Sequence, residues 1–567
     1  MVLQFKARRR DVKSFGKPGA RRKIRVKLIR EFIAEQWRKL QLIHWSNLKQ
    51  PRYLWLLGAI CVGLLARAPG IFWGANFPTG WFGHHVDEYS HLVNAEKLIN
   101  PAAPPRWEHP YPKGLAAHVA VPIIALDLVR GKYPQTPPTP GKIMIAGRAI
   151  GVLYGTATIL LVFLFARLLF RDARVADLAA WLLALGGLHV SQSHFFVSDV
   201  PSLFWFLLGS YLLFLDLKKM DQPNIMGLSL AAACLGISFG LKLGIFGLPS
   251  LALVALMRPP RATRAIQVGA FFFAGFMLVN FASYTPYDIW KTLSTGISDT
   301  DYQFSWPSSL MLYLIELPSI ISFPLTILAL GGGLLLIRKF VAMRADARFV
   351  PIVLVVVAPL AINAYFALFK FDHFARHLVP FIPWLVIAAG WGLVKMIDRL
   401  ASRQRLGRLV VALVFLYLAV FVFDGEKVFF QEPRNQAARW LLDNVPASTH
   451  VAWVYHNWLP GYVIVGFPEQ ERPPVLVMEM HYANHFLSGM GLKNSYPTEA
   501  KFIFDGQSNE RVKTLQAVFR GESEYREVAR FREGYVMPEY ILVDHLIGNR
   551  SRNYVAEIVI FTKPPEQ

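Results

Sequence analysis

Long apolar runs, repeated along most of the chain and separated by short polar loops, constrain this sequence more than any other feature. A membrane-spanning helix needs roughly 20 apolar residues. The first such run covers residues 53–73, and 54% of all 567 residues are hydrophobic. A chain of this length with that composition is too apolar for a soluble protein, so the sequence predicts a polytopic membrane protein.

Basic residues are concentrated before the first apolar run. Residues 1–52 contain 16 Lys and Arg against three acidic residues, in a chain whose formal charge is +22. A basic block directly before a spanning segment faces the cytoplasm and is attracted to anionic lipids. We find no aromatic or base-reading elements around it that would suit nucleic acid. We therefore expect a cytoplasmic tail, with the run at 53–73 kept as an anchor rather than cleaved as a signal peptide.

The short basic loops predict how the later apolar runs cross the membrane. Residues 115–129 are short for a span and are interrupted by His118, Pro122 and Asp127, so we interpret them as an interfacial helix on the outer surface. Eleven spans then remain, and nearly all strongly basic short loops face the cytoplasm. After the first, these spans cover residues 143–170, 174–194, 200–218, 228–239, 243–257, 266–284, 309–337, 350–369, 378–395 and 409–423.

The composition changes to that of a soluble domain after Asp424. We divide the chain into the tail at 1–52, an all-α membrane domain at 53–424 with an outer loop at 74–142, and a small extracytoplasmic α/β domain at 425–567. In the last domain the pattern predicts helices at 433–444 and 510–519 and strands at 450–455, 475–480, 540–543 and 558–562.

Two adjacent carboxylates, Asp87 and Glu88, lie in the first predicted outer loop. One interpretation is a solvated loop at the wet membrane boundary, where acids carry no particular cost. The other is a reaction centre in which a carboxylate deprotonates a nucleophile while cations hold a lipid phosphate. The same predicted face also carries His109, Lys113, His194, Asp199, Lys242 and Arg376.

Lys242 lies between two apolar runs, where a charge is costly unless it is paired or reaches the interface. Gly240 and Gly244 flank it and would let a phosphate approach the backbone. A snorkelling lysine at a helix turn is the alternative.

Arg376 and Asp199 each have a second interpretation. Arg376 could bind a phosphate through two N–H groups, or pair with Asp372 at a spacing of four residues. Asp199 could belong to the reaction centre, or cap a helix that starts at Pro201.

Five segments taken together resemble a known family. They are Asp87-Glu88-Tyr89, residues 109–114, residues 147–201, Lys242 and residues 375–383. In combination they are similar to the protein O-mannosyltransferases and their bacterial relatives, over roughly residues 53–423. Two features depart from that family: His377 stands where a Tyr is usual, and the domain after Asp424 is not the β-trefoil of the eukaryotic enzymes.

The resemblance implies an integral-membrane glycosyltransferase of the C-type (GT-C) fold in a bacterial inner or plasma membrane. Such an enzyme uses a polyprenyl-phosphate-linked sugar and inverts the anomeric centre. By this resemblance Asp87 is the catalytic base and Glu88 helps to hold the site, while Lys242 and Arg376 bind the donor phosphate. The supporting residues would be His109, Lys113, His194 and Asp199. The two departures leave both the sugar and the acceptor (protein, lipid or glycan) open.

No strong metal-binding motif and no Gly-rich nucleotide loop is present in the sequence. Its two cysteines, Cys61 and Cys234, lie in apolar runs and favour neither a disulfide framework nor a thiolate metal site. The lipid-linked sugar is then the one expected cosubstrate, and dependence on a divalent metal stays open. The rival interpretation is a transporter or flippase of a lipid-linked sugar, but no inverted repeat and no concentration of ionisable residues at the membrane midplane favours it.

Overall fold

The computed structural model of the protein describes residues 51–73, 85–100, 102, 113–131, 138–170, 172–217, 225–242, 248–257, 260–280, 306–342, 349–369, 375–454, 463–465, 473–479, 517–518, 521–532, 534–547 and 557–564. The chain divides into two compact units, Met1–Gly58 and Ala59–Gln567. Apart from residues 51–58 at the start of helix α4, everything that follows concerns the second unit. Residues 1–50 of the predicted basic tail, His109 and Asp372 lie outside the described residues, as does the predicted helix at 510–519 apart from Ala517 and Val518.

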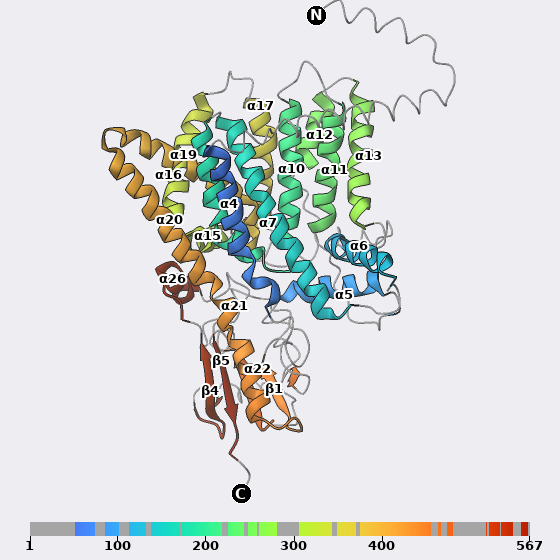
Figure 1. The fold of residues 1–567 in the computed structure, drawn as a ribbon, viewed down its shortest axis with the longest axis vertical. Helices are drawn as coiled ribbons and strands as arrows, with labels where there is room; N and C mark the ends of the chain where they lie inside the picture. Colours follow the sequence, from blue (N-terminus) through green and yellow to red (C-terminus); the bar gives the residue numbers. More distant parts are fainter. Residues whose placement is uncertain are drawn as a thin grey trace, which may run out of the picture. The chain divides into compact units, whose positions relative to one another are not determined.

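Helices make up most of the described chain (Figure 1). From the N-terminal side they are α4 (Pro51–Arg67), η2 (Pro69–Phe72), α5 (Val86–Ile99), α6 (Gly114–Val129), α7 (Pro140–Phe170), α8 (Ala173–Ala184), α9 (Gly187–Gln192), α10 (Asp199–Leu217), α11 (Ile225–Lys242), α12 (Leu248–Met257) and α13 (Arg261–Asn280). They continue with α15 (Trp306–Ile321), α16 (Phe323–Ala342), α17 (Phe349–Ile352), η4 (Val353–Val357), α18 (Ala358–Phe369), η5 (Ala375–Phe381), α19 (Ile382–Arg399), η6 (Ala401–Arg403), α20 (Gln404–Glu426), α21 (Val428–Gln431), α22 (Pro433–Asn444) and α26 (Pro538–Ile547).

Eight of the described helices are long and apolar enough to cross a membrane. They account for eight of the eleven predicted spans. The other three also fold as helices, but α8 with α9, α11 and α12 are each shorter or less apolar than a full span. The predicted interfacial stretch is helix α6, which belongs to the same class of shorter apolar helices.

One predicted span is wrong as a single helix. Residues 309–337 fold as two helices, α15 and α16, because Ser322 adopts a left-handed backbone with φ of 81° between them. The Ser322 hydroxyl and carbonyl then accept bonds from the first turn of α16, at Leu325 and Thr326. The two prolines at 318 and 324 gave a signal of this break that the hydropathy of the run obscured.

Helix α7 fixes the distance between the two ends of the membrane domain. Arg148 lies near its start, and Phe170 is its last residue. The 22 residues between them rise by about 33 Å at 1.5 Å per residue, close to the roughly 30 Å of a bilayer's hydrocarbon core. The polar residues around Arg148 and those just beyond Phe170 therefore lie at opposite membrane faces.

The helices that carry the candidate site pack side by side. Helix α11 packs against both α10 and α13, and α10 packs against α7. Helices α5 and α6 pack on each other and lie across one end of this group (Figure 1). Their shared core includes Leu92, Leu115, Met144 and Leu241 from four helices and Phe196 from the segment before α10, so four helices and a loop meet at that end.

A five-stranded sheet forms the core of the C-terminal domain. Its strands are β1 (Val451–Val454), β2 (Val463–Val465), β3 (Val475–Glu479), β4 (Arg526–Arg532) and β5 (Glu557–Thr562), in the order β2-β1-β3-β5-β4. The first three are parallel, while β5 runs antiparallel to both of its neighbours. The predicted α/β class is confirmed, and helix α22 has the predicted bounds.

Three assignments in this domain differ from prediction, and the first is the short strand β2, which was not predicted. Residues 540–543 were expected as a strand but lie in helix α26, which packs on α15 in the membrane domain. Strand β4 was not predicted, because its alternating basic residues give a weakly apolar face. The differences at 540–543 and at β4 follow from local hydropathy, which does not show which partner an apolar segment packs against.

Candidate functional site

The two adjacent acids form the first turn of helix α5 rather than a loop. His85 is the N-cap, and its Nδ1 accepts a bond from the backbone N–H of Asp87 at 3.1 Å. The Glu88 carboxylate in turn accepts from the His85 backbone N–H, which completes a capping box. Both acids thus lie where the helix dipole favours negative charge. Both are also buried, which contradicts the interpretation as a solvated loop.

Glu88 is held by a buried arginine. The Arg148 guanidinium donates from Nε to Glu88 Oε1 at 2.7 Å and from Nη2 to Oε2 at 2.9 Å, and the backbone N–H of Phe196 donates to Oε1 at 2.8 Å. Arg148 also donates to the carbonyl of Trp73. Burial opposes ionisation of Glu88, but Arg148 outweighs it, and the pKa of Glu88 falls below its usual value. Glu88 is therefore an ionised anchor rather than a proton carrier.

A row of glycines on α7 makes room for the segment that contacts Glu88. A Cβ at Gly147 would lie 2.3 Å from the Phe196 ring, and one at Gly151 would lie 2.8 Å from the Ser193 carbonyl oxygen. A Cβ at Gly155 would meet the Ser193 hydroxyl at 2.3 Å. These glycines recur every four residues, so they line one face of the helix. Their lack of side chains lets the 193–196 segment lie against α7 and reach Glu88.

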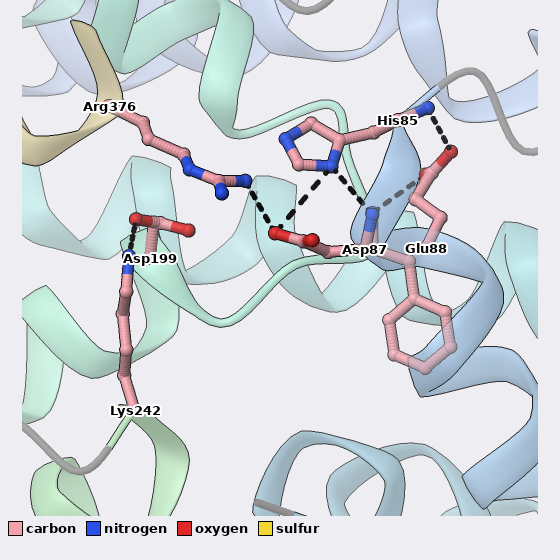
Figure 2. A network of polar contacts seen from close by, with 7 residues as sticks. His85, Asp87, Glu88, Asp199, Lys242 and Arg376 are labelled. Atoms are coloured by element: carbon pink, nitrogen blue, oxygen red, sulfur yellow. Dashed lines mark hydrogen bonds and ion pairs between the residues drawn. The ribbon is translucent and has the colours of Figure 1, made fainter. Parts of the chain in front are cut away.

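Asp87 points away from Glu88, toward a different cation. Arg376, on the short helix η5, places Nη1 2.5 Å from Asp87 Oδ2 (Figure 2). The His85 Nδ1 lies 3.9 Å from the same oxygen. The structure thus pairs Arg376 with Asp87 across 289 residues, while Asp372 lies outside the described residues.

A second acid and cation pair beside the first. Lys242, the last residue of α11, binds Asp199, the first residue of α10 (Figure 2). The Lys242 side chain keeps 38% of its surface exposed, against 5% for Asp199. Asp199 thus forms an ion pair with another helix instead of only capping its own. Lys242 is paired with a carboxylate instead of only reaching the membrane interface.

Gly240 has a different role from the one predicted. A Cβ there would lie 2.5 Å from Nδ2 of Asn280 on α13, and its carbonyl accepts a bond from that amide at 3.0 Å. At Gly114, the first residue of α6, a Cβ would lie 2.5 Å from that same carbonyl oxygen. Gly240 therefore brings helices close together rather than exposing backbone to a phosphate, and Gly244 lies outside the described residues.

The two pairs surround one region. Electrostatic effects of both Asp87 and Asp199 reach the rings of His85 and His91. Burial lowers the pKa of His85 and lowers that of His91 to about 4, so both rings are neutral near pH 7. Because Nδ1 of His85 accepts a hydrogen bond, its proton lies on Nε2. Among these six side chains, the charge consists of two carboxylates and two cations.

The predicted supporting residues have separate positions. His194 is buried and pairs with Glu426 at the end of α20, against Phe429 and beneath Gly70. Lys113 precedes α6, and no hydrogen bond or ion pair joins its side chain to the described cluster. His109 is outside the described part of the chain. Asp199 therefore belongs to the cluster, whereas the described contacts of His194 are with Glu426 and Phe429.

Sequence reasoning did not single out Arg148, His85 as a cap, or Glu426. Arg148 lies within the glycine repeat at four-residue spacing, and that repeat was an available signal of a closely packed helix face. His85 precedes Glu88 by the three residues of a capping box, but the box normally begins with Ser or Thr. Glu426 gave no local signal, because its partner His194 is 232 residues away.

Within the described residues, no group of three or more His, Cys, Asp or Glu is arranged to hold a metal ion. The carboxylates of Asp87 and Asp199 are each bonded to a cation from another helix instead. The described donor set is therefore not that of a preformed metal site.

Comparison with known proteins gives one family match. The family of dolichyl-phosphate-mannose-protein mannosyltransferases matches residues 135–259. This segment contains Arg148, Asp199 and Lys242, whereas Asp87 and Arg376 lie outside it. No curated protein matches the chain. The predicted resemblance to this family is confirmed.

Solved structures share the fold over most of the chain. The Archaeoglobus fulgidus oligosaccharyltransferase in complex with Zn and sulfate aligns with a TM-score of 0.51 and 13% identity, covering 90% of this chain and 88% of its own. The oligosaccharyltransferase AglB of that organism, in complex with an inhibitory peptide and a dolichol-phosphate, aligns with a TM-score of 0.50 and 12% identity, covering 92% and 89%. The chain has the GT-C fold.

ArnT from Cupriavidus metallidurans, bound to undecaprenyl phosphate, has a TM-score of 0.44 and 14% identity over 77% of this chain and 95% of its own. At such identities the likeness to AglB establishes the GT-C fold alone. Together with the apolar helices, that fold makes the chain a multi-pass integral membrane protein.

Proposed function

We propose that the chain is an inverting membrane glycosyltransferase that moves a sugar from a polyprenyl-phosphate donor to an extracytoplasmic acceptor, with Asp87 as the base. One observation carries the proposal: Asp87, Arg376, Asp199 and Lys242 come from four separate helical elements and meet in one partly open cluster. Burying acids and cations at the end of spanning helices costs free energy, so a group of this kind indicates a functional site.

The donor assignment combines the cluster with the family match. The matching family is named for a dolichyl-phosphate-linked sugar, and one solved structure of AglB is in complex with a dolichol-phosphate. A leaving phosphate gains negative charge as the sugar departs, and nearby cations lower the barrier by binding it. Arg376 and Lys242 are the two partly open cations of the described cluster.

Asp87 is the stronger candidate for the base of the two adjacent acids. A general base must be ionised, reachable and free to take a proton. Glu88 is fully enclosed and bonded through both oxygens, whereas the Asp87 side chain retains 12% exposure. Attack by the deprotonated acceptor on the face opposite the phosphate inverts the anomeric carbon.

The test is transfer of radiolabelled sugar from a panel of polyprenyl-phosphate hexoses and pentoses, in membranes containing wild type or Asp87→Asn at matched abundance. We expect wild-type transfer and a fall of about 10³-fold or more in the variant, in line with the loss of an essential proton-transfer group. The active donor identifies the sugar, and the labelled product identifies the acceptor as protein, lipid or glycan.

Two outcomes would contradict the proposal. Undiminished transfer by Asp87→Asn would assign the base to another acid. Movement of labelled lipid between leaflets without any transfer would instead support the transporter. The matched control is Asp172→Asn, because Asp172 lies just beyond Phe170 at the opposite membrane face, bonded to Arg174. We expect the control to transfer at the wild-type rate.

A further inference from the structure

Both cations assigned to the donor phosphate are already bound to carboxylates. Arg376 is bound to Asp87, and Lys242 to Asp199 (Figure 2). A donor phosphate cannot take the full strength of either cation while its carboxylate partner holds it. The two acids and the phosphate therefore compete for the same N–H groups.

The two pairs are open enough to exchange partners. The side chains of Asp87 and Arg376 are 12% and 15% exposed, and Lys242 is more exposed still. Separating a fully buried pair carries a large desolvation cost, whereas a partly exposed pair separates more readily as another anion arrives. The neutral His85 and His91 add no charge to this exchange.

We propose that Asp87 and Asp199 hold Arg376 and Lys242 in the donor-free protein, and that the donor phosphate displaces both carboxylates. This inference rests on the proposed function. Displacement releases Asp87 from its cation, and a carboxylate without a nearby cation is a stronger base. Donor binding thus activates the base, and the donor binds productively before the acceptor.

The charges balance through the reaction. The bond between the anomeric carbon and the phosphate oxygen breaks, and its electron pair stays on that oxygen. The acceptor oxygen forms the new bond to the anomeric carbon, and its proton moves to Asp87. One negative charge on the donor and one on Asp87 become two on the polyprenyl phosphate. Arg376 consequently loses its attraction to Asp87 at the step in which the phosphate gains charge.

The exchange makes a prediction with an unusual sign: removing an acid should tighten binding. Affinity for polyprenyl phosphate would be measured with purified protein in nanodiscs, for wild type, Asp87→Asn, Asp199→Asn and the control Asp172→Asn. We expect each of the first two variants to bind roughly two- to fivefold more tightly, the range that follows from releasing one partly exposed ion pair. The control should match wild type, and unphosphorylated polyprenol should bind all four proteins equally.

Unchanged or weaker binding by both variants would overturn the exchange. Asp199→Asn provides a second measurement if Asp87→Asn does not fold. The transfer assay separates the two proposals. Transfer by wild type without tighter binding by the variants would support the proposed glycosyltransferase and contradict the exchange of ion pairs. Tighter binding without transfer from any donor would support the exchange and contradict the glycosyltransferase. A lack of polyprenyl-phosphate binding by every protein would overturn both.

Discussion

Glu88–Arg148 and Asp87–Arg376 are two acid–arginine pairs whose acids are neighbours in sequence, yet their surroundings differ. Both side chains of the first pair are fully buried, while both of the second are partly exposed. Successive residues of a helix point about 100° apart. The first turn of α5 therefore directs one carboxylate into the protein and the other toward the open cluster.

The difference in burial suggests different roles for the two pairs, one in anchoring helices and the other in the reaction. Glu88 receives three N–H donors from Arg148 and Phe196, and these join α5, α7 and the segment before α10. Asp87 is bonded to Arg376, the cation that leaves it in the proposed exchange. The first pair should therefore control stability and the second the chemistry, and the following variants test that division.

The largest stability effect should come from Glu88→Gln. The change leaves Arg148 buried without its counter-charge, and breaking a buried pair costs about 3–5 kcal/mol. Asp87→Asn should cost less than Glu88→Gln, because both side chains of the Asp87–Arg376 pair keep some contact with solvent, which weakens the attraction that is lost. Chemical or thermal unfolding of both variants in the same detergent would measure this. An equal loss of stability in Glu88→Gln and Asp87→Asn would contradict the division of roles between the two pairs.

Acid should lower the stability of this region in two successive pH ranges, which overlap only between about pH 4 and 4.5. The folded protein lowers the pKa of His91 from 6.5 to about 4. Between those values the unfolded chain binds a proton that the folded chain does not, so stability falls as pH falls, by up to about 3 kcal/mol. The lowered pKa of Glu88 acts only below its ordinary value of 4.5, where stability is lost as that carboxylate becomes protonated.

The His91→Asn variant isolates the first range. In this variant the unfolding midpoint should depend less on pH between pH 6.5 and 4, while the loss of stability below pH 4.5 should remain. An unchanged pH profile in His91→Asn would show that other groups, with His85 foremost, produce the slope.

A smaller effect is expected where the glycine face seats the 193–196 segment. Gly151→Ala would place a Cβ 2.8 Å from the Ser193 carbonyl and 3.1 Å from that of Phe195. The resulting shift should cost about 1–3 kcal/mol, as overpacking does, and slow transfer by displacing the Phe196 N–H from Glu88. The matched control is Gly333→Ala on α16, which has no atom within 4 Å of its Cβ; it should be neutral or stabilising.

The smallest effect should come from Glu426→Gln. Glu426 pairs with His194, two residues before the Phe196 N–H that binds Glu88. We expect a few-fold fall in kcat with an unchanged KM for the donor, because the pair orients the segment without touching the donor site. Glu426→Asp should recover part of the loss. A rise in donor KM instead would place Glu426 nearer the donor than the structure does.

The long apolar runs predicted most of the membrane helices, because a helix that lies in lipid consists of a long and nearly charge-free run. It missed the break at Ser322, where a single left-handed residue divides one apolar run into two helices. The acids and both cations of the cluster were identified from residue type and predicted face. Their pairing was not, since Asp87 and Arg376 are joined only by tertiary packing.

Helix α26 interrupts the C-terminal sheet in the order of the chain. Glu539 on α26 accepts bonds from the Tyr417 hydroxyl at 2.8 Å and from the Phe323 backbone N–H at 2.9 Å, both in the membrane domain. The chain then returns to supply β5, which lies between β3 and β4. During synthesis, β4 has no described neighbour until residues 557–562 have emerged. The sheet is therefore completed last, after every membrane helix has been made, and a chain that stopped before Glu557 would carry an assembled site beneath an unfinished domain.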